Sequence, residues 1–118
     1  MKKHLVLLLA LAATVLMTSC TKSKGDYYVR YDVTLTSVYI GTMTVEVNTE
    51  KGVQSFQTSS KTFSETFGPV NKGFNASISA SHDLYYGTLN TSIYVCKGED
   101  PFVLKATGSS SAEYVIDF

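Results

Sequence analysis

Few residues in this sequence could supply a nucleophile and a base. His82 is the only histidine after residue 19, Asp83 follows it directly, and serines are plentiful. Adjacent residues of an extended chain point in opposite directions, and no Gly-x-Ser-x-Gly turn presents a serine. We therefore expect no Ser-His-Asp hydrolase, and we interpret His82 as a loop residue at the end of a strand.

The sequence also lacks the patterns that hold metal ions. One histidine cannot build a site of two or three imidazoles, and neither Cys-x-x-Cys nor His-Glu-x-x-His occurs. The acidic residues mostly fall on the polar side of predicted strands or in turns, which favours a solvated surface over a glycosidase pair; they are Asp26, Asp32, Glu46, Glu50, Glu65, Asp83, Glu99, Asp100, Glu113 and Asp117. Adjacent Glu99 and Asp100 offer too few ligands for calcium. We predict a protein without a metal, without a cofactor and without enzymatic activity.

The start of the chain has the layout of an export signal. Basic Lys2 and Lys3 precede an apolar stretch from Leu5 to Met17, and small polar residues follow it. This stretch is shorter than the roughly 20 residues that cross a membrane as a helix, so we expect the leader to be removed. The predicted organisation is a signal peptide at 1–19, a tether at 20–26 and one folded domain at 27–118.

The residue after the leader is a cysteine. The stretch Met17-Thr18-Ser19-Cys20 resembles the lipobox of bacterial lipoproteins and is similar to the form found in the Bacteroidetes. The resemblance implies a diacylglycerol thioether on Cys20, cleavage before it and acylation of the new amine. Because firm anchoring needs more than one signal or chain, such a protein would be held at the cell membrane or outer membrane, on a periplasmic or cell-surface face. The alternative is a plain secreted protein.

The composition bears on partners and on the second cysteine. The chain has 10 basic and 10 acidic residues, and removal of Lys2 and Lys3 with the leader leaves 8 against 10. No basic stripe or nucleic-acid motif occurs, so we expect no nucleic-acid partner. If Cys20 is lipidated, Cys96 has no other cysteine in the chain, and we expect a lone thiol that behaves as a small buried hydrophobe. An intermolecular bridge or a reactive thiol is the alternative.

Apolar and polar residues alternate through most of the chain after residue 26, which is typical of half-buried strands. Strands are predicted around 27–35, 43–47, 53–56, 63–67, 74–80, 89–96, 102–106 and 112–118. Gly68-Pro69 is expected to end one of them, because proline cannot donate to a strand ladder. Seven or eight short strands joined by short turns predict an all-β, antiparallel β-sandwich, immunoglobulin- or transthyretin-like but without the immunoglobulin disulfide.

One further resemblance is carried by the strands. The stretch 91–98, in which alternating Ile93 and Val95 run into Gly98, and Gly68-Pro69 before a serine-rich strand look like the β-sandwich of the mycobacterial membrane protein small (MmpS) group and related Bacteroidetes lipoproteins. The resemblance implies a sandwich with an accessory, non-catalytic role beside an envelope transporter. Members of that group resemble single-pass membrane proteins, whereas this chain has a lipobox, so only the fold and the accessory character are carried over.

Tyrosines are the residues that favour a binding role. Tyr85 and Tyr86 are adjacent in a predicted loop, so both cannot face one core, and Tyr94 lies on the polar side of its strand. A tyrosine with a wet hydroxyl and an apolar ring suits sugar stacking and protein interfaces. We predict a lipid-anchored, non-enzymatic envelope module that binds a partner or serves as an accessory to an envelope transporter. The alternatives are a glycan or small-ligand binder and a surface adhesin or assembly subunit.

Overall fold

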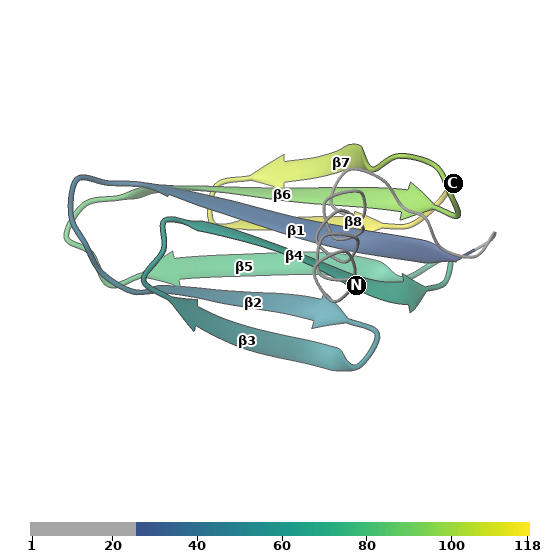
Figure 1. Ribbon diagram of the computed structural model, residues 1–118, viewed down its shortest axis with the longest axis horizontal. Helices are drawn as coiled ribbons and strands as arrows, with labels where there is room; N and C mark the ends of the chain where they lie inside the picture. Colours follow the sequence, from purple (N-terminus) through teal and green to yellow (C-terminus); the bar gives the residue numbers. More distant parts are fainter. Residues whose placement is uncertain (1–25) are drawn as a thin grey trace, which may run out of the picture.

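The computed structural model describes residues 26–118, which form eight strands and no helix (Figure 1). The strands are β1 Tyr27–Thr36, β2 Met43–Thr49, β3 Gly52–Thr58, β4 Thr62–Val70, β5 Asn75–His82, β6 Thr88–Lys97, β7 Val103–Gly108 and β8 Ser111–Val115. The predicted leader at 1–19, Cys20 and the tether up to residue 25 lie outside the described residues. In the described part of the chain, no helix is long and apolar enough to cross a membrane.

The strands form two four-stranded antiparallel sheets packed face to face. Sheet A has the order β4-β1-β6-β7 and sheet B the order β3-β2-β5-β8. The central pair of sheet A, β1 and β6, is aligned over its full length from Tyr27↔Lys97 to Thr36↔Thr88. The predicted all-β antiparallel sandwich is confirmed.

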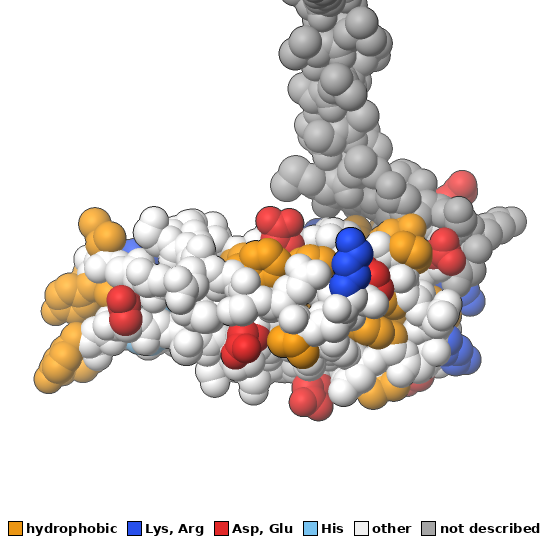
Figure 2. All heavy atoms as spheres, turned by 90° about the horizontal axis from the view of Figure 1, so that it is seen from below, with side chains coloured by type: hydrophobic (Ala, Val, Ile, Leu, Met, Phe, Trp, Pro, Cys, Tyr) orange, Lys and Arg blue, Asp and Glu red, His pale blue; other side chains and the backbone are white. Residues whose placement is uncertain are grey.

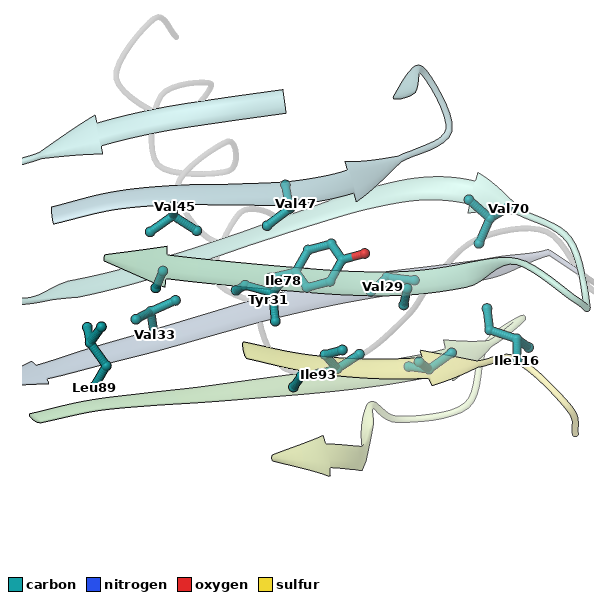
Figure 3. Close-up of a cluster of buried hydrophobic side chains, with 14 of the residues drawn as sticks. Val29, Tyr31, Val33, Val45, Val47, Val70, Ile78, Leu89, Ile93 and Ile116 are labelled. Atoms are coloured by element: carbon teal, nitrogen blue, oxygen red, sulfur yellow. The ribbon is translucent and has the colours of Figure 1, made fainter. Parts of the chain in front are cut away.

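The core lies between the sheets and follows the alternation in the sequence (Figure 3). Along β1 every second residue is buried, from Tyr27 to Leu35, while the residues between them are partly or fully exposed. Because side chains of a strand alternate between its two faces, the period-two pattern gives each sheet one apolar face. The fully buried side chains at the centre are Val29, Tyr31, Val33, Met43, Val45, Val47, Ile93, Val95 and Ile116.

Tyr31 is the largest of these side chains, and it brings a hydroxyl into the core. The residue has no exposed surface, and its hydroxyl donates a 2.6 Å hydrogen bond to the Asn48 carbonyl on β2. One side chain therefore joins the two sheets by packing and by a polar contact. Burial raises the pKa of the Tyr31 hydroxyl well above its ordinary value and outweighs an opposing backbone hydrogen bond with Ser77.

This raised pKa predicts a loss of stability in alkali. The folded protein keeps the Tyr31 proton at a pH where the unfolded chain has lost it, so the stabilisation is complete below about pH 10 and falls above it, by about 1.4 kcal/mol per pH unit. Burial also raises the pKa values of Tyr28 and Tyr114, so Tyr31→Phe is the control. Urea titrations from pH 8 to 11 should show a shallower decline for this variant; equal slopes would contradict the assignment.

Gly68-Pro69 does not end a strand, which corrects the sequence prediction. β4 continues through both residues to Val70. β4 is an edge strand that pairs only with β1, and the register shifts by one residue between the pairs Tyr27↔Val70 and Val29↔Phe67. Edge strands and bulges are the places where a strand accommodates proline, because no neighbour needs its missing N–H.

The structure also differs from the sequence pattern in which side chains of β7 face the core. Period-two alternation over the predicted strand 102–106 puts Leu104 on one face with Phe102 and Ala106, and that face would be the apolar one, but Leu104 is 49 % exposed. The register between β6 and β7 shifts after the pair Ile93↔Ala106, so that Leu104 lies opposite Tyr94. Tyr94 faces away from the core, and the bulge therefore turns Leu104 outward with it.

Residues 26–118 contain only Cys96, so no disulfide joins the two sheets in the described part of the chain. Cys96 is buried on the outer side of β6, but it is disulfide-bonded in the structure and is not the lone thiol expected from the sequence. An oxidising compartment, which the export signal predicts, permits such a bond.

Candidate functional site

Two loops lie side by side at one end of the sandwich (Figure 1). One joins β1 to β2 at residues 37–42, and the other joins β5 to β6 at residues 83–87. β1 starts at the opposite end with Tyr27 and has ten residues. At about 3.3 Å per residue, the loops are therefore roughly 30 Å from the point where the tether joins the domain.

The loops carry five exposed apolar side chains, Val38, Tyr39, Ile40, Tyr85 and Tyr86, which we call the apolar tip. Val38 and Ile40 are 89 % and 88 % exposed, and Tyr85 is 85 % exposed. Figure 2 shows hydrophobic side chains projecting together from this end of the domain. The rings of Tyr85 and Tyr86 lie edge to face with centroids 4.6 Å apart, so they do not form one flat surface.

Hydrogen bonds between the loops hold the apolar tip in place. The Ser37 hydroxyl donates to the Tyr86 carbonyl at 2.7 Å, across 49 residues of sequence. Thr42 N–H donates to the Asp83 carboxylate at 2.8 Å, and Asp83 N–H donates to the Thr42 carbonyl at 3.2 Å. Gly41 permits this approach, because a Cβ there would lie 2.3 Å from Leu84 Cδ2. The two loops therefore form one ordered unit.

His82 and Asp83 accept hydrogen bonds from the backbone of the two loops. His82 is the last residue of β5 and not the first of the loop, which corrects the sequence boundary. Its Nδ1 accepts a hydrogen bond from Leu84 N–H at 3.1 Å, while the Asp83 carboxylate binds the other loop. The two side chains hold different backbone groups, and this geometry assigns both to the support of the apolar tip.

The structure separates Tyr94 from the other two tyrosines predicted to bind. Tyr94 lies near the middle of sheet A on the outer face, six residues along β6 from Thr88 and so roughly 20 Å from the loops. Its ring packs beneath the Arg30 guanidinium at 4.1 Å, a cation–π contact within the sheet. Tyr85 and Tyr86 thus share a site, and Tyr94 does not belong to it.

The other surface features lie elsewhere. A shallow hollow crosses the outer face of sheet B between Glu46, Ser79 and Glu113, and a second lies at the tether end beside Glu50 and Lys72. Neither is lined by a residue of the apolar tip. Within residues 26–118 no group of three or more His, Cys, Asp and Glu side chains is arranged to hold a metal ion.

The sequence analysis predicted two of the five residues of the apolar tip. It singled out Tyr85 and Tyr86 but passed over Val38, Tyr39 and Ile40. The sequence did contain a signal for them. These three apolar residues lie in a connection between two strands, where small and polar residues are usual. What no spacing revealed is that the two loops, more than 40 residues apart in the sequence, meet at one end of the fold.

Comparison with known proteins finds no matching family model, no similar curated protein and no similar solved structure. The resemblance to the MmpS group therefore stays a prediction based on residues 91–98 and on Gly68-Pro69. The function has to be inferred from the described surface.

Proposed function

We propose that the protein is a lipid-anchored, non-enzymatic module of the cell envelope, and that the apolar tip is its contact surface. The supporting observation is the apolar tip itself, in which three aliphatic or aromatic side chains are at least 85 % exposed and are supplied by two hydrogen-bonded loops. Contiguous exposed apolar patches on a soluble domain usually mark an interaction site. A loop without such a role would place polar residues there.

The hydrogen bonds that hold the two loops support the proposal that the apolar tip is a contact surface. An exposed loop normally satisfies its backbone with water, so it has no need of partners within the protein. Here Ser37, His82 and Asp83 provide side-chain partners for backbone groups of both loops. Loops held in this way keep their apolar side chains in a fixed arrangement, which lowers the entropy cost of docking.

A glycan is the less favoured ligand. A sugar site combines a flat ring with several free polar groups, but Tyr85 and Tyr86 lie at 89° to each other. The Asp83 carboxylate and the Ser37 hydroxyl already have protein partners. The hydrogen-bonding capacity left at the apolar tip is mainly that of the tyrosine hydroxyls, which favours an apolar partner.

Assembly through an unpaired strand is also less favoured. The sheet edges are β3, β4, β7 and β8. β4 carries Pro69 and a register shift, and β7 and β8 have only six and five residues. Short, bulged or proline-bearing edges are features that discourage pairing with another chain. Among the described strands this applies to three of the four edges, whereas β3 has seven residues in regular register with β2 and keeps this alternative open.

The Cys20 sulfur cannot form both a thioether with a lipid and a disulfide with Cys96. Cys20 is the only other cysteine of the chain, so a bridge within one molecule would use the sulfur that a thioether needs. We propose that the Cys20 sulfur carries the thioether in the mature protein. Alkylation of the unfolded mature protein with iodoacetamide before and after reduction tests this, because a bridge between Cys96 and Cys20 in that protein would refute the anchor.

The anchor predicts a large effect of Cys20→Ala. The variant should incorporate no labelled palmitate and should leave the membrane fraction, because no acyl chain remains to hold it. Scintillation counting of the immunoprecipitated protein and fractionation of cells would measure both. Cys96→Ala is the matched control and should label as the wild type does. Equal labelling of Cys20→Ala and the wild type would refute the anchor.

A further inference from the structure

We infer that the apolar tip inserts into the interfacial region of the same membrane that holds the lipid, so that the domain is attached at two points. The inference rests on the proposed anchor at Cys20, and it adds a second, non-covalent contact made by the folded domain.

The residue types of the apolar tip match the layers of a membrane surface. Val38 and Ile40 are aliphatic and nearly fully exposed, and Tyr39, Tyr85 and Tyr86 add exposed amphipathic rings at the same end of the domain. Tyrosine is enriched at membrane interfaces, where the ring contacts hydrocarbon and the hydroxyl reaches the headgroups. At this end of the domain the hydrophobic side chains form several projections and no single flat surface (Figure 2). A bilayer can surround such side chains without a complementary shape, whereas a protein would need a matching pocket for each.

The residues of the apolar tip carry no charge. Residues 37–42 and 84–87 contain no charged side chain. Asp83, at the start of its loop, accepts the Thr42 N–H at 2.8 Å, and Lys61, beside the other loop, donates to the Ser37 carbonyl. A charge buried in hydrocarbon is costly, and here both nearby charges are committed to backbone groups behind the apolar side chains.

Several backbone groups of the loops already have partners within the protein. Tyr39 N–H donates to the Ser37 hydroxyl at 3.1 Å, and the same hydroxyl donates to the Tyr86 carbonyl. Leu84 N–H is taken by His82 Nδ1, and the backbone groups of Thr42 and Asp83 satisfy each other. Backbone groups near hydrocarbon must find partners within the protein. An ordinary exposed loop has water and needs no such set.

The length of the tether makes the anchoring membrane the nearest apolar phase. Six residues, 21–26, separate Cys20 from Tyr27, and an extended chain of that length spans at most about 22 Å. The domain is therefore confined within a few tens of ångströms of the bilayer, at a high effective concentration. A domain lying along the surface can keep the tether at one end and place the apolar tip in the membrane roughly 30 Å away.

A single tryptophan provides the test, because the chain has none of its own. Ile40→Trp would be introduced into the full chain, and the processed, lipidated protein would be reconstituted in vesicles of phosphatidylethanolamine and phosphatidylglycerol. Lipids brominated along the acyl chain quench a tryptophan that penetrates them. We expect a blue-shifted emission and strong quenching, since interfacial apolar segments enter by about 5–10 Å.

Val53→Trp is the matched control. Val53 is 69 % exposed on the outer face of β3, outside the apolar tip, and its tryptophan should be quenched severalfold less. Ile40→Trp combined with Tyr85→Ser and Tyr86→Ser should also be quenched less than Ile40→Trp alone.

Flotation of the vesicles separates the two proposals. If the protein does not float with them, the anchor is wrong. If it floats while the residue-40 tryptophan is not quenched, the anchor stands and insertion is overturned. Equal quenching at positions 40 and 53 would also overturn it. Shielding of position 40 only after addition of envelope proteins would assign the apolar tip to a protein partner instead.

Discussion

Tyr31→Ala should destabilise the folded domain by about 3–5 kcal/mol, the range measured for removal of a large aromatic side chain from a core. Tyr31 has no exposed surface and lies between Val29 and Val33 on β1, packed against sheet B. Its loss leaves a cavity at the centre of the sandwich and removes the hydrogen bond to the Asn48 carbonyl. Because a domain of this size has a total stability of about 5–15 kcal/mol, this single change approaches the limit of folding.

Tyr31→Phe separates the two contributions. It keeps the ring, including the contact with Phe67 at a centroid distance of 6.0 Å, and removes only the hydroxyl, so it should cost about 1–2 kcal/mol. Urea unfolding followed by circular dichroism would give both values. A loss below 1 kcal/mol for Tyr31→Ala would mean that the sheets do not pack around this residue as described.

Val38→Asp combined with Ile40→Asp should abolish docking of the apolar tip and leave the fold intact. Both residues are nearly 90 % exposed, and surface changes of this kind usually alter stability by less than about 0.5 kcal/mol. Each aliphatic side chain that is buried on docking contributes about 1.5–3 kcal/mol, so loss of two of them lowers the docked population by about a hundredfold or more. The added carboxylates oppose re-entry.

Hydroxyl-radical footprinting of Tyr85 in native membranes would measure this effect. Tyr85 is 85 % exposed in the isolated domain, so docking should shield it in the wild type, and the double variant should restore its oxidation. Val53→Asp, on the outer face of sheet B, should leave the wild-type pattern. Equal oxidation of Tyr85 in the wild type and the double variant would show that the apolar tip is not docked.

Different residues are expected to determine the stability of the domain and the docking of the apolar tip. The core residues of β1 lie inside the sandwich and hold it together, whereas the apolar tip adds little to folding. A substitution that weakens membrane contact at unchanged melting temperature therefore belongs to the apolar tip, and one that lowers both acts through the core.

The sequence by itself determined the fold class and the buried face of most strands. Alternation with a period of two is a local property, and it identified the inward face of β1, β2, β5 and β6 because those strands are regular and central in their sheets. The local pattern also flagged Tyr85 and Tyr86 as residues that could not both be buried.

Tertiary structure decided the rest. Pro69 continues β4 only because that strand lies at an edge, and Leu104 faces outward only because the β6–β7 register shifts. The apolar tip exists because β1 ends where β6 begins, which brings Ser37 within hydrogen-bonding distance of Tyr86. Strand pairing and register are relations between distant segments, and hydrophobic periodicity within one segment carries no information about them.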